Sequence, residues 1–196
     1  MASKIKVDEL ETGNGSGTIA LQNQLSGMTT ASLPTLTSAQ MPVGSVLQVV
    51  SATLSSQVAI TTTSMVNTDI GLTATITPTS TSSKILIMYK INYCNSSGAG
   101  QTCNLVRGST QIGNADTGTG VEGFLSMQTA NMNTYWSLEA AGSYLDSPST
   151  TSAAAYKFTV IAANTNSSLI TFNRTARLDA YDPLAVSTIT LMEIQG

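Results

Sequence analysis

The chain has 196 residues and a net charge of −3, and its 8 basic side chains form no cluster that would neutralise phosphates, which excludes nucleic acid as a partner. No run of about 18 apolar residues exists to span a bilayer, so we expect no membrane insertion. Histidine is absent, which excludes Ser-His-Asp and Cys-His catalysis and removes the commonest zinc ligand.

Residues 1–28 differ from the rest of the chain. Five charged side chains lie within K-I-K-V-D-E-L-E (residues 4–11), and the segment G-N-G-S-G separates them from T-I-A-L. A short strand such as Thr18–Leu21, next to several glycines, cannot bury its own apolar side chains. We therefore predict an N-terminal arm that packs against another copy or another protein. The apolar residues expected to make this contact are Ile5, Val7, Leu10, Ile19 and Leu21.

Residues 29–42 contain two prolines and no helical stripe, so we interpret them as an extended linker that ends near Pro42. From there on, short β-branched runs recur at intervals of roughly 8–12 residues, which is typical of an antiparallel β-sandwich or barrel. We expect one all-β head domain over residues 43–196. The predicted strands are 46–51, 57–61, 72–77, 84–94, 103–107, 122–128, 134–139, 156–163, 169–173 and 186–194. The segments Leu125–Met132 and Leu138–Tyr144 are the candidates for short helical turns.

The clearest strand is K-I-L-I-M-Y-K-I-N-Y, residues 84–93. Its core face is predicted by a period of two, and it comprises Ile85, Ile87, Tyr89, Ile91 and Tyr93. The opposite face begins apolar and ends polar, so we expect it to be covered at the apolar end and wet at the polar end.

Cys94 and Cys103 flank N-S-S-G-A-G-Q-T. A hairpin turning at Gly98 and Ala99 would set them opposite one another, so a cross-strand disulfide is one alternative. We favour two small, free thiols, because a protein made in the cytosol is kept reduced. Two thiolates without a further Cys or His do not complete a zinc site.

Gly118, Gly120 and Gly123 match G-x-G-x-x-G, but no crossover helix pattern follows them, so we predict a loop and no nucleotide. Asp179 and Asp182 in R-L-D-A-Y-D-P would suit calcium or a pair of hydrolase carboxylates. We favour a solvated turn, because neither an EF-hand spacing nor a second acidic cluster accompanies them.

Trp136 is the single tryptophan, with Tyr135, Tyr144 and Phe124 near it in sequence. These rings would suit a carbohydrate-stacking platform, because a flat ring offers apolar area with a polar edge. Large aromatic side chains are more often buried, so core or subunit-interface packing is the favoured interpretation.

Five segments carry a resemblance, and they occur in one order along the chain. They are G-S-V-L-Q-V-V-S (44–51), I-T-P-T-S-T-S-S-K-I-L-I (76–87), L-V-R-G-S-T-Q-I-G (105–113), Y-L-D-S-P-S-T-T-S-A-A-A-Y (144–156) and S-T-I-T-L-M-E-I-Q-G (187–196). Together they resemble the C-terminal module of virion fibre-like proteins of tailed phages, particularly marine and cyanobacterial ones. The resemblance implies a jelly-roll head that assembles as a homotrimer, like complement-type and tumour-necrosis-factor-like heads.

Residues 1–28 are also similar to the short segments by which such proteins dock on a virion. The chain has no extended shaft between this segment and the head, which favours a compact spike, head fibre or capsid decoration protein. The resemblance implies no catalytic residue and no cofactor. The partners it implies are two further copies and a capsid, portal or tail protein gripped by the arm.

We therefore expect a non-enzymatic virion structural protein, assembled in the host cytoplasm. Leu86 and Met88, on the outer face of the central strand, are the predicted subunit interface, and Tyr135 and Trp136 are the predicted contacts with a host surface glycan. A capsid decoration protein and a bacterial lectin-like binding module are the alternatives. A polysaccharide depolymerase fits worst, because the 11 acidic residues are scattered along the chain.

Overall fold

The computed structural model describes residues 37–62, 66–95, 100–114, 123–127, 135–162 and 168–196. A 3-10 turn, Ser38–Gln40, precedes the strands. The strands are β1 Val46–Leu54, β2 Val58–Thr62, β3 Thr68–Ile76, β4 Lys84–Asn95, β5 Gln101–Arg107, β6 Thr110–Ile112, β7 Leu125–Ser126, β8 Leu138–Asp146, β9 Ala154–Ala162, β10 Ser168–Phe172 and β11 Ser187–Ile194. Among these residues no helix is long and apolar enough to cross a membrane.

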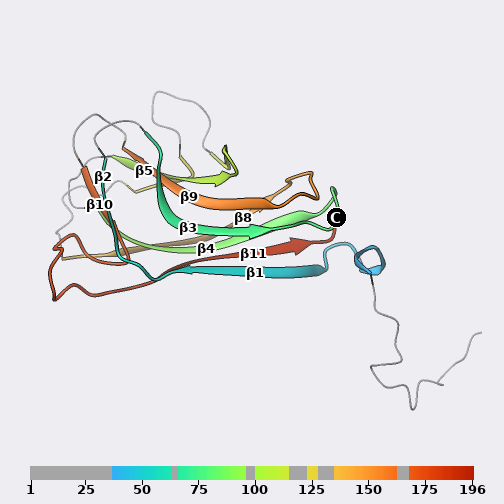
Figure 1. Cartoon of the computed structure of the whole chain (residues 1–196), viewed down its shortest axis with the longest axis horizontal. Helices are drawn as coiled ribbons and strands as arrows, with labels where there is room; N and C mark the ends of the chain where they lie inside the picture. Colours follow the sequence, from blue (N-terminus) through green and yellow to red (C-terminus); the bar gives the residue numbers. More distant parts are fainter. Residues whose placement is uncertain (1–36, 63–65, 96–99, 115–122, 128–134, 163–167) are drawn as a thin grey trace, which may run out of the picture. The chain divides into compact units, whose positions relative to one another are not determined.

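The strands form two antiparallel sheets that face one another (Figure 1). Sheet A has the order β1-β11-β4-β8, and sheet B has the order β3-β9-β5-β6, with β7 also on β5. β2 and β10 extend sheet A at one end. Consecutive strands alternate between the two sheets from β2 to β5 and from β7 to β10. The prediction of an all-β antiparallel sandwich is therefore confirmed.

The core lies between the sheets and is made by alternate residues of each strand. In β4 the side chains of Ile85, Ile87 and Ile91 are fully buried, as the period of two predicts. Four aromatic rings meet in edge-on and tilted contacts, with centroids 5.3–6.4 Å apart. Phe158 is fully buried in the core, and the partly buried Tyr89, Phe124 and Tyr144 pack against the core. Phe124 and Tyr144 are thus not part of an exposed platform.

One expectation is wrong in this region. Leu138–Tyr144 is not a helical turn but most of β8, which pairs with β4 along nine residues. Its small residues fit beside β4, because a side chain on Gly142 would lie 2.6 Å from the Tyr89 hydroxyl.

The hairpin alternative for Cys94 and Cys103 is excluded, because β4 belongs to sheet A and β5 to sheet B. Both cysteines are free and buried, so the favoured interpretation as free thiols is confirmed.

Buried charges tie the two sheets together at the end where β11 finishes. The Asp146 carboxylate of β8 accepts hydrogen bonds from the Arg107 guanidinium at 2.6 Å and the Tyr156 hydroxyl at 2.7 Å, both on sheet B. Burial raises the pKa of Tyr156, and the bond to Asp146 adds to this rise. The tyrosine therefore stays a neutral donor to the carboxylate.

Glu193 of β11 is a second buried carboxylate at this end, with no exposed surface. It accepts hydrogen bonds from Gln48 of β1 at 2.6 Å and from the backbone and hydroxyl of Thr79 at 2.7 and 2.8 Å. Burial alone would raise the pKa of Glu193, but these donors outweigh it and lower the pKa. The charged carboxylate thereby holds the β3–β4 turn onto sheet A.

Asn173 occupies the point where β10 leaves sheet A. Both β10 and β11 pair with the same side of β4, and a long loop, residues 173–186, connects them. The fully buried Asn173 side chain donates to the carbonyls of Leu54 and Ser56 at 2.8 and 2.9 Å and accepts from the Ser187 hydroxyl at 2.7 Å. It therefore joins the break between β1 and β2 to the start of β11.

The backbone of Asn173 is also fully bonded. Its N–H donates to Asn92 at 3.1 Å, and its carbonyl accepts from Ala185 at 3.1 Å. Its φ of 62° lies in the left-handed region, which Asn tolerates better than most residues. The chain therefore leaves the sheet without an unpaired buried polar group.

The 173–186 loop corrects the prediction for the outer face of β4. The polar end of that face is the covered one, since Asn92 is 9% exposed and Cys94 is fully buried. The apolar end is open, because Met88 is 45% exposed. Sequence polarity gave the wrong prediction because this end has polar partners from distant residues. The Asn173 N–H donates to the Asn92 carbonyl at 3.1 Å, and the Ser187 hydroxyl at the start of β11 accepts from the Asn92 N–H at 3.0 Å.

Replacement of Asn173 should destabilise the head strongly. Asn173→Gly removes three buried side-chain hydrogen bonds but keeps the left-handed backbone, so we expect a loss of about 2–4 kcal/mol in unfolding free energy. Asn173→Ala should lose about 1 kcal/mol more, because Ala disfavours positive φ. Denaturant unfolding measures both. Ser149→Gly is the control, since Ser149 is exposed at a φ of 52°, and an Asn173→Gly protein as stable as the unmodified chain would contradict this role.

Glu193 predicts an acid-labile end of the sandwich. The pKa of Glu193 in the folded state lies below its ordinary value of 4.5. The charged carboxylate therefore stabilises the fold above the ordinary pKa, and this stabilisation is lost as the pH falls through the folded-state pKa. Glu193→Gln should cost about 1–3 kcal/mol at pH 7. The difference between the two proteins should shrink between about pH 5 and pH 3, measured by urea unfolding at each pH. A difference that stays constant over this interval would exclude the buried carboxylate as its source.

Candidate functional site

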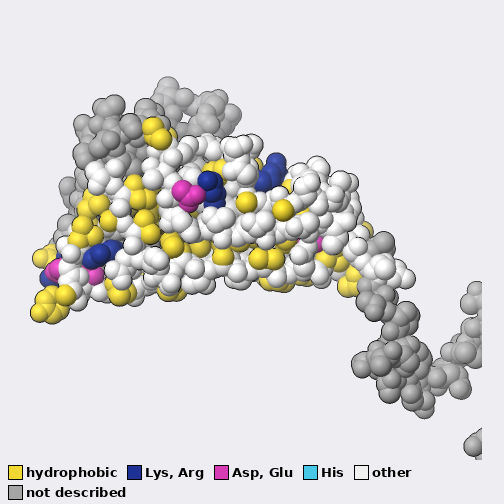
Figure 2. Space-filling view, in the orientation of Figure 1, with side chains coloured by type: hydrophobic (Ala, Val, Ile, Leu, Met, Phe, Trp, Pro, Cys, Tyr) yellow, Lys and Arg dark blue, Asp and Glu magenta, His cyan; other side chains and the backbone are white. Residues whose placement is uncertain are grey.

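The first candidate surface is the outer face of sheet A. One register row crosses its four strands through Val49 of β1, Met192 of β11, Leu86 of β4 and Leu145 of β8. Val49 is 56% and Leu145 50% exposed, although both are aliphatic. In Figure 1, β1 lies along the lower margin of the molecule, and Figure 2 shows hydrophobic side chains along this margin. We call these four residues together with Met88 the sheet-A row.

Next to this row the face is hollowed into a shallow groove of about 610 Å³. Its lining includes Ala141 and Ser143 of β8, Met88 and Lys90 of β4, and Thr190 of β11, and Met88 lies in register between Ser143 and Thr190. The next charged residues on β4 are Lys84 and Lys90, one on each side of the row; Lys90 pairs with Glu139 at 3.2 Å. The row itself is thus an uncharged band across sheet A.

The structure brings the predicted residues Leu86 and Met88 into this band. The sequence prediction missed Val49, Leu145 and Met192, which come from three other strands. Alternation within each strand indicates which residues point outward. Only the register between strands distant in sequence shows that these residues share one row.

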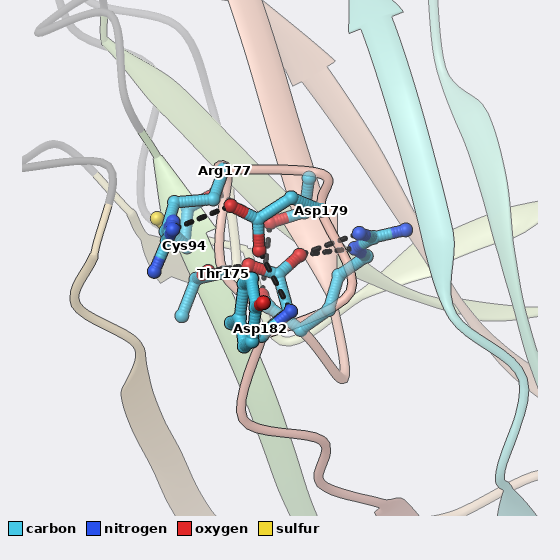
Figure 3. Close-up of polar contacts among 8 residues, drawn as sticks. Cys94, Thr175, Arg177, Asp179 and Asp182 are labelled. Atoms are coloured by element: carbon cyan, nitrogen blue, oxygen red, sulfur yellow. Dashed lines mark hydrogen bonds and ion pairs between the residues drawn. The ribbon is translucent and has the colours of Figure 1, made fainter.

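The second candidate surface is the 173–186 loop, which is fixed by Asp182 (Figure 3). The Asp182 side chain is only 1% exposed, and its carboxylate accepts from Arg174 Nε at 3.0 Å and from the Thr175 hydroxyl at 2.5 Å. Burial alone would raise the pKa of Asp182, but the Thr175 and Arg174 donors lower it. The solvated turn predicted for this pair is therefore wrong for Asp182.

Asp179 lies further out on the same loop and forms a separate ion pair with Arg177 at 2.6 Å (Figure 3). The Arg177 guanidinium carbon lies 4.7 Å from the centroid of the Tyr135 ring and 5.9 Å from that of the Tyr181 ring. These distances indicate cation–π contacts. Tyr135 is 56%, Trp136 65% and Tyr181 82% exposed. Packing of Tyr135 and Trp136 in the core is therefore excluded, whereas their subunit-interface packing and their contact with a glycan stay predictions.

Sequence reasoning missed Arg174, Arg177 and Tyr181. A signal was present, because residues 174–182 hold two arginines and two aspartates in a chain that is only 10% charged. Such a concentration of opposite charges in one turn-rich segment indicates ion pairs that fix a loop.

The remaining predicted sites carry no ligand chemistry in the described residues. No three His, Cys, Asp or Glu side chains gather there to hold a metal ion. Gly118 and Gly120 lie outside the described residues, whereas Gly123 packs so closely that an added Cβ would lie 2.4 Å from the Thr102 side chain. The predicted docking residues Ile5, Val7, Leu10, Ile19 and Leu21 also lie outside the described residues.

No protein-family model and no curated protein sequence matches the chain. Its function is therefore inferred from the two surfaces, the fold and the resemblance carried by the five sequence segments.

The role of Asp182 predicts a change in the reactivity of one thiol. Cys94 lies beneath the loop, with hydrogen bonds to the Ala176 backbone and the Thr171 hydroxyl, and its burial raises the pKa of the thiol. Asp182→Ala should release the loop and make one thiol react about ten-fold faster with a thiol reagent. Cys103, buried between the sheets, should stay protected.

Asp179→Ala is the matched control, because Asp179 pairs with Arg177 at the surface and not with the buried anchor. It should leave both thiols slow to react. If each thiol reacts as slowly in the Asp182→Ala protein as in the unmodified protein, Asp182 does not hold the loop.

Proposed function

We propose that this chain is a non-enzymatic structural protein of a tailed-phage virion, which forms a homotrimer through the outer face of sheet A. The observation that carries the proposal is the sheet-A row, an uncharged apolar row that crosses four strands and lies open on the described part of the molecule. Large exposed apolar patches mark interaction sites more often than chance exposure does.

A further copy of the chain suits this surface. The uncharged band between Lys84 and Lys90 lets identical faces approach without electrostatic repulsion. The exposed aliphatic groups gain about 25 cal/mol for each Å² that association removes from water. Closed symmetry is the usual outcome when one surface recurs on every subunit, and the number three comes from the resemblance to trimeric heads.

The position of the chain's entry into the sandwich fits an anchored head. Gly44 donates to the Gln195 carbonyl and Gln195 donates to Ser45, so residues 37–45 join the sandwich beside the end of β11. The 173–186 loop lies at the start of β11, at the opposite end of that strand. An arm that grips a capsid, portal or tail protein would thus leave the loop farthest from the attachment.

The acidic side chains support a structural role. All six acidic residues in the described part of the chain have a hydrogen bond or an ion pair. They are Asp69, Glu139, Asp146, Asp179, Asp182 and Glu193. Each holds a turn, a loop or a sheet contact, whereas acid–base catalysis requires carboxylates that are free to exchange protons with a substrate.

A capsid decoration protein is the second candidate. The sequence supports it, because only the predicted linker, residues 29–42, lies between the predicted arm and the head. In this case particles lacking the protein should lose resistance to heat or osmotic shock and still adsorb to host cells. Normal resistance combined with lost adsorption would favour an outward-facing fibre or spike.

Charges placed in the sheet-A row should separate the subunits. The double substitution Leu86→Asp and Met88→Asp would bury two carboxylates per subunit in the proposed interface. The free energy of burying these unpaired charges exceeds the free energy gained from the apolar contact. We expect sedimentation to change from three times the chain mass of 20.3 kDa to one chain mass. The β signal in circular dichroism should remain.

Thr75→Asp is the matched control, because Thr75 is exposed on β3 of the other sheet. It should leave the trimer intact. An unmodified chain that sediments as one subunit at high concentration would overturn the trimer, and loss of the β signal in the double variant would show that Leu86 and Met88 support the fold of one subunit instead.

A further inference from the structure

We propose that an aromatic patch binds a neutral hexopyranose polysaccharide. The aromatic patch is defined as Arg177, Asp179 and Tyr181 of the 173–186 loop, Tyr135 before β8, and Trp136, the chain neighbour of Tyr135. The inference rests on the proposed function only in assigning that polysaccharide to a host surface. Binding itself requires no particular oligomeric state. The site joins the start of β8 to the β10–β11 loop.

The arrangement of the patch is that of rings around a polar centre. Arg177 lies between the Tyr135 and Tyr181 rings, at 4.7 and 5.9 Å from their centroids. Its ion pair with Asp179 places donors and acceptors beside the ring faces. A pyranose has C–H groups on its faces and hydroxyls around its edge. Its faces can therefore stack on the tyrosine rings while its hydroxyls form hydrogen bonds with Arg177 and Asp179.

The loop part of the patch, Asp179 and Tyr181, is anchored although it is exposed. Tyr181 precedes Asp182, whose buried carboxylate binds Arg174 and Thr175. The Tyr181 N–H donates to the Asp179 carboxylate at 2.9 Å, and the Asp182 N–H lies 3.4 Å from the Asp179 carbonyl. Rings that are already positioned lose little conformational entropy when a ligand stacks on them. The buried Asp182 carboxylate thereby fixes the position of the exposed Tyr181 side chain.

The charges and the area favour a sugar over a protein. The one arginine and one aspartate of the patch cancel, so neither an anionic polymer nor a charged partner is selected. Taking about 200 Å² for each ring, the three rings expose roughly 400 Å², half of the roughly 800 Å² that each partner gives to a stable protein interface. Exposed Leu178 and Leu184 extend the apolar area, but the hydrated Arg177–Asp179 pair would have to be buried under a protein.

The patch also lies where a particle would meet a host. It is carried by the loop at the start of β11, whereas residues 37–45 enter beside the end of β11. Figure 2 shows hydrophobic, basic and acidic side chains gathered at the end of the molecule away from the C-terminus marked in Figure 1. A head anchored through its arm would present this end outward.

Affinity electrophoresis of the full chain tests the proposal. Native gels contain soluble dextran, mannan or galactan as neutral probes, or alginate as the acidic probe. We expect retardation by at least one neutral polysaccharide. Tyr181→Ala and Trp136→Ala should each weaken it by about ten-fold, because each removes one stacking surface. Tyr181→Phe, which keeps the ring, and Thr75→Ala, on the other sheet, should bind like the unmodified chain.

Three results would overturn the inference: no retardation by any neutral probe, retardation by alginate alone, or retardation that Tyr181→Ala and Trp136→Ala leave unchanged. Sedimentation of the same preparations separates this inference from the proposed function. A trimer that binds none of the neutral probes overturns the sugar site alone, whereas a monomer that binds one overturns the trimer alone.

Discussion

The buried side chain of Asn173 is the contact on which the rest of the head depends. It lets the chain leave sheet A after β10 and return as β11 on the same side of β4, while its amide joins the break between β1 and β2. Without such a bridge, the carbonyls of Leu54 and Ser56 and the Ser187 hydroxyl would lose buried partners, at about 1–3 kcal/mol each. The segment between the two strands is the 173–186 loop, which carries Asp182 and the exposed Tyr181 ring.

The two surfaces of the head differ in physical character and in position. The sheet-A row is flat, aliphatic and uncharged, and it spans four strands of a rigid sheet. The aromatic patch is small, polar at its centre and carried by a loop at one end of the sandwich. The first suits a permanent contact that excludes water, and the second suits a reversible contact with a hydrated ligand. Their separation would let the proposed trimer contact and the proposed sugar contact form without competing for the same residues.

The sequence predicts those features of the fold that depend on the periodicity of apolar residues along single strands. The alternation Ile85, Ile87, Ile91 identifies the core face of β4, and the spacing of β-branched runs predicts an antiparallel sandwich. It does not predict that Val49 lies in one row with Leu145, because their register depends on two intervening strands. It also does not predict that Asp182 is buried, since that follows from its contacts with Arg174 and Thr175 across the loop. The polar end of β4 is predicted to face solvent for the same reason: its cover comes from residues 77 and 95 positions away.

Imaging of the assembled phage particle at a resolution that places single strands tests the central claim most directly. The proposal predicts this chain on the virion in groups of three, with the outer faces of sheet A turned toward a common axis and the 173–186 loops pointing away from the particle. Single copies on the particle, threefold groups joined through sheet B, or particles that contain no copy of the chain would contradict it.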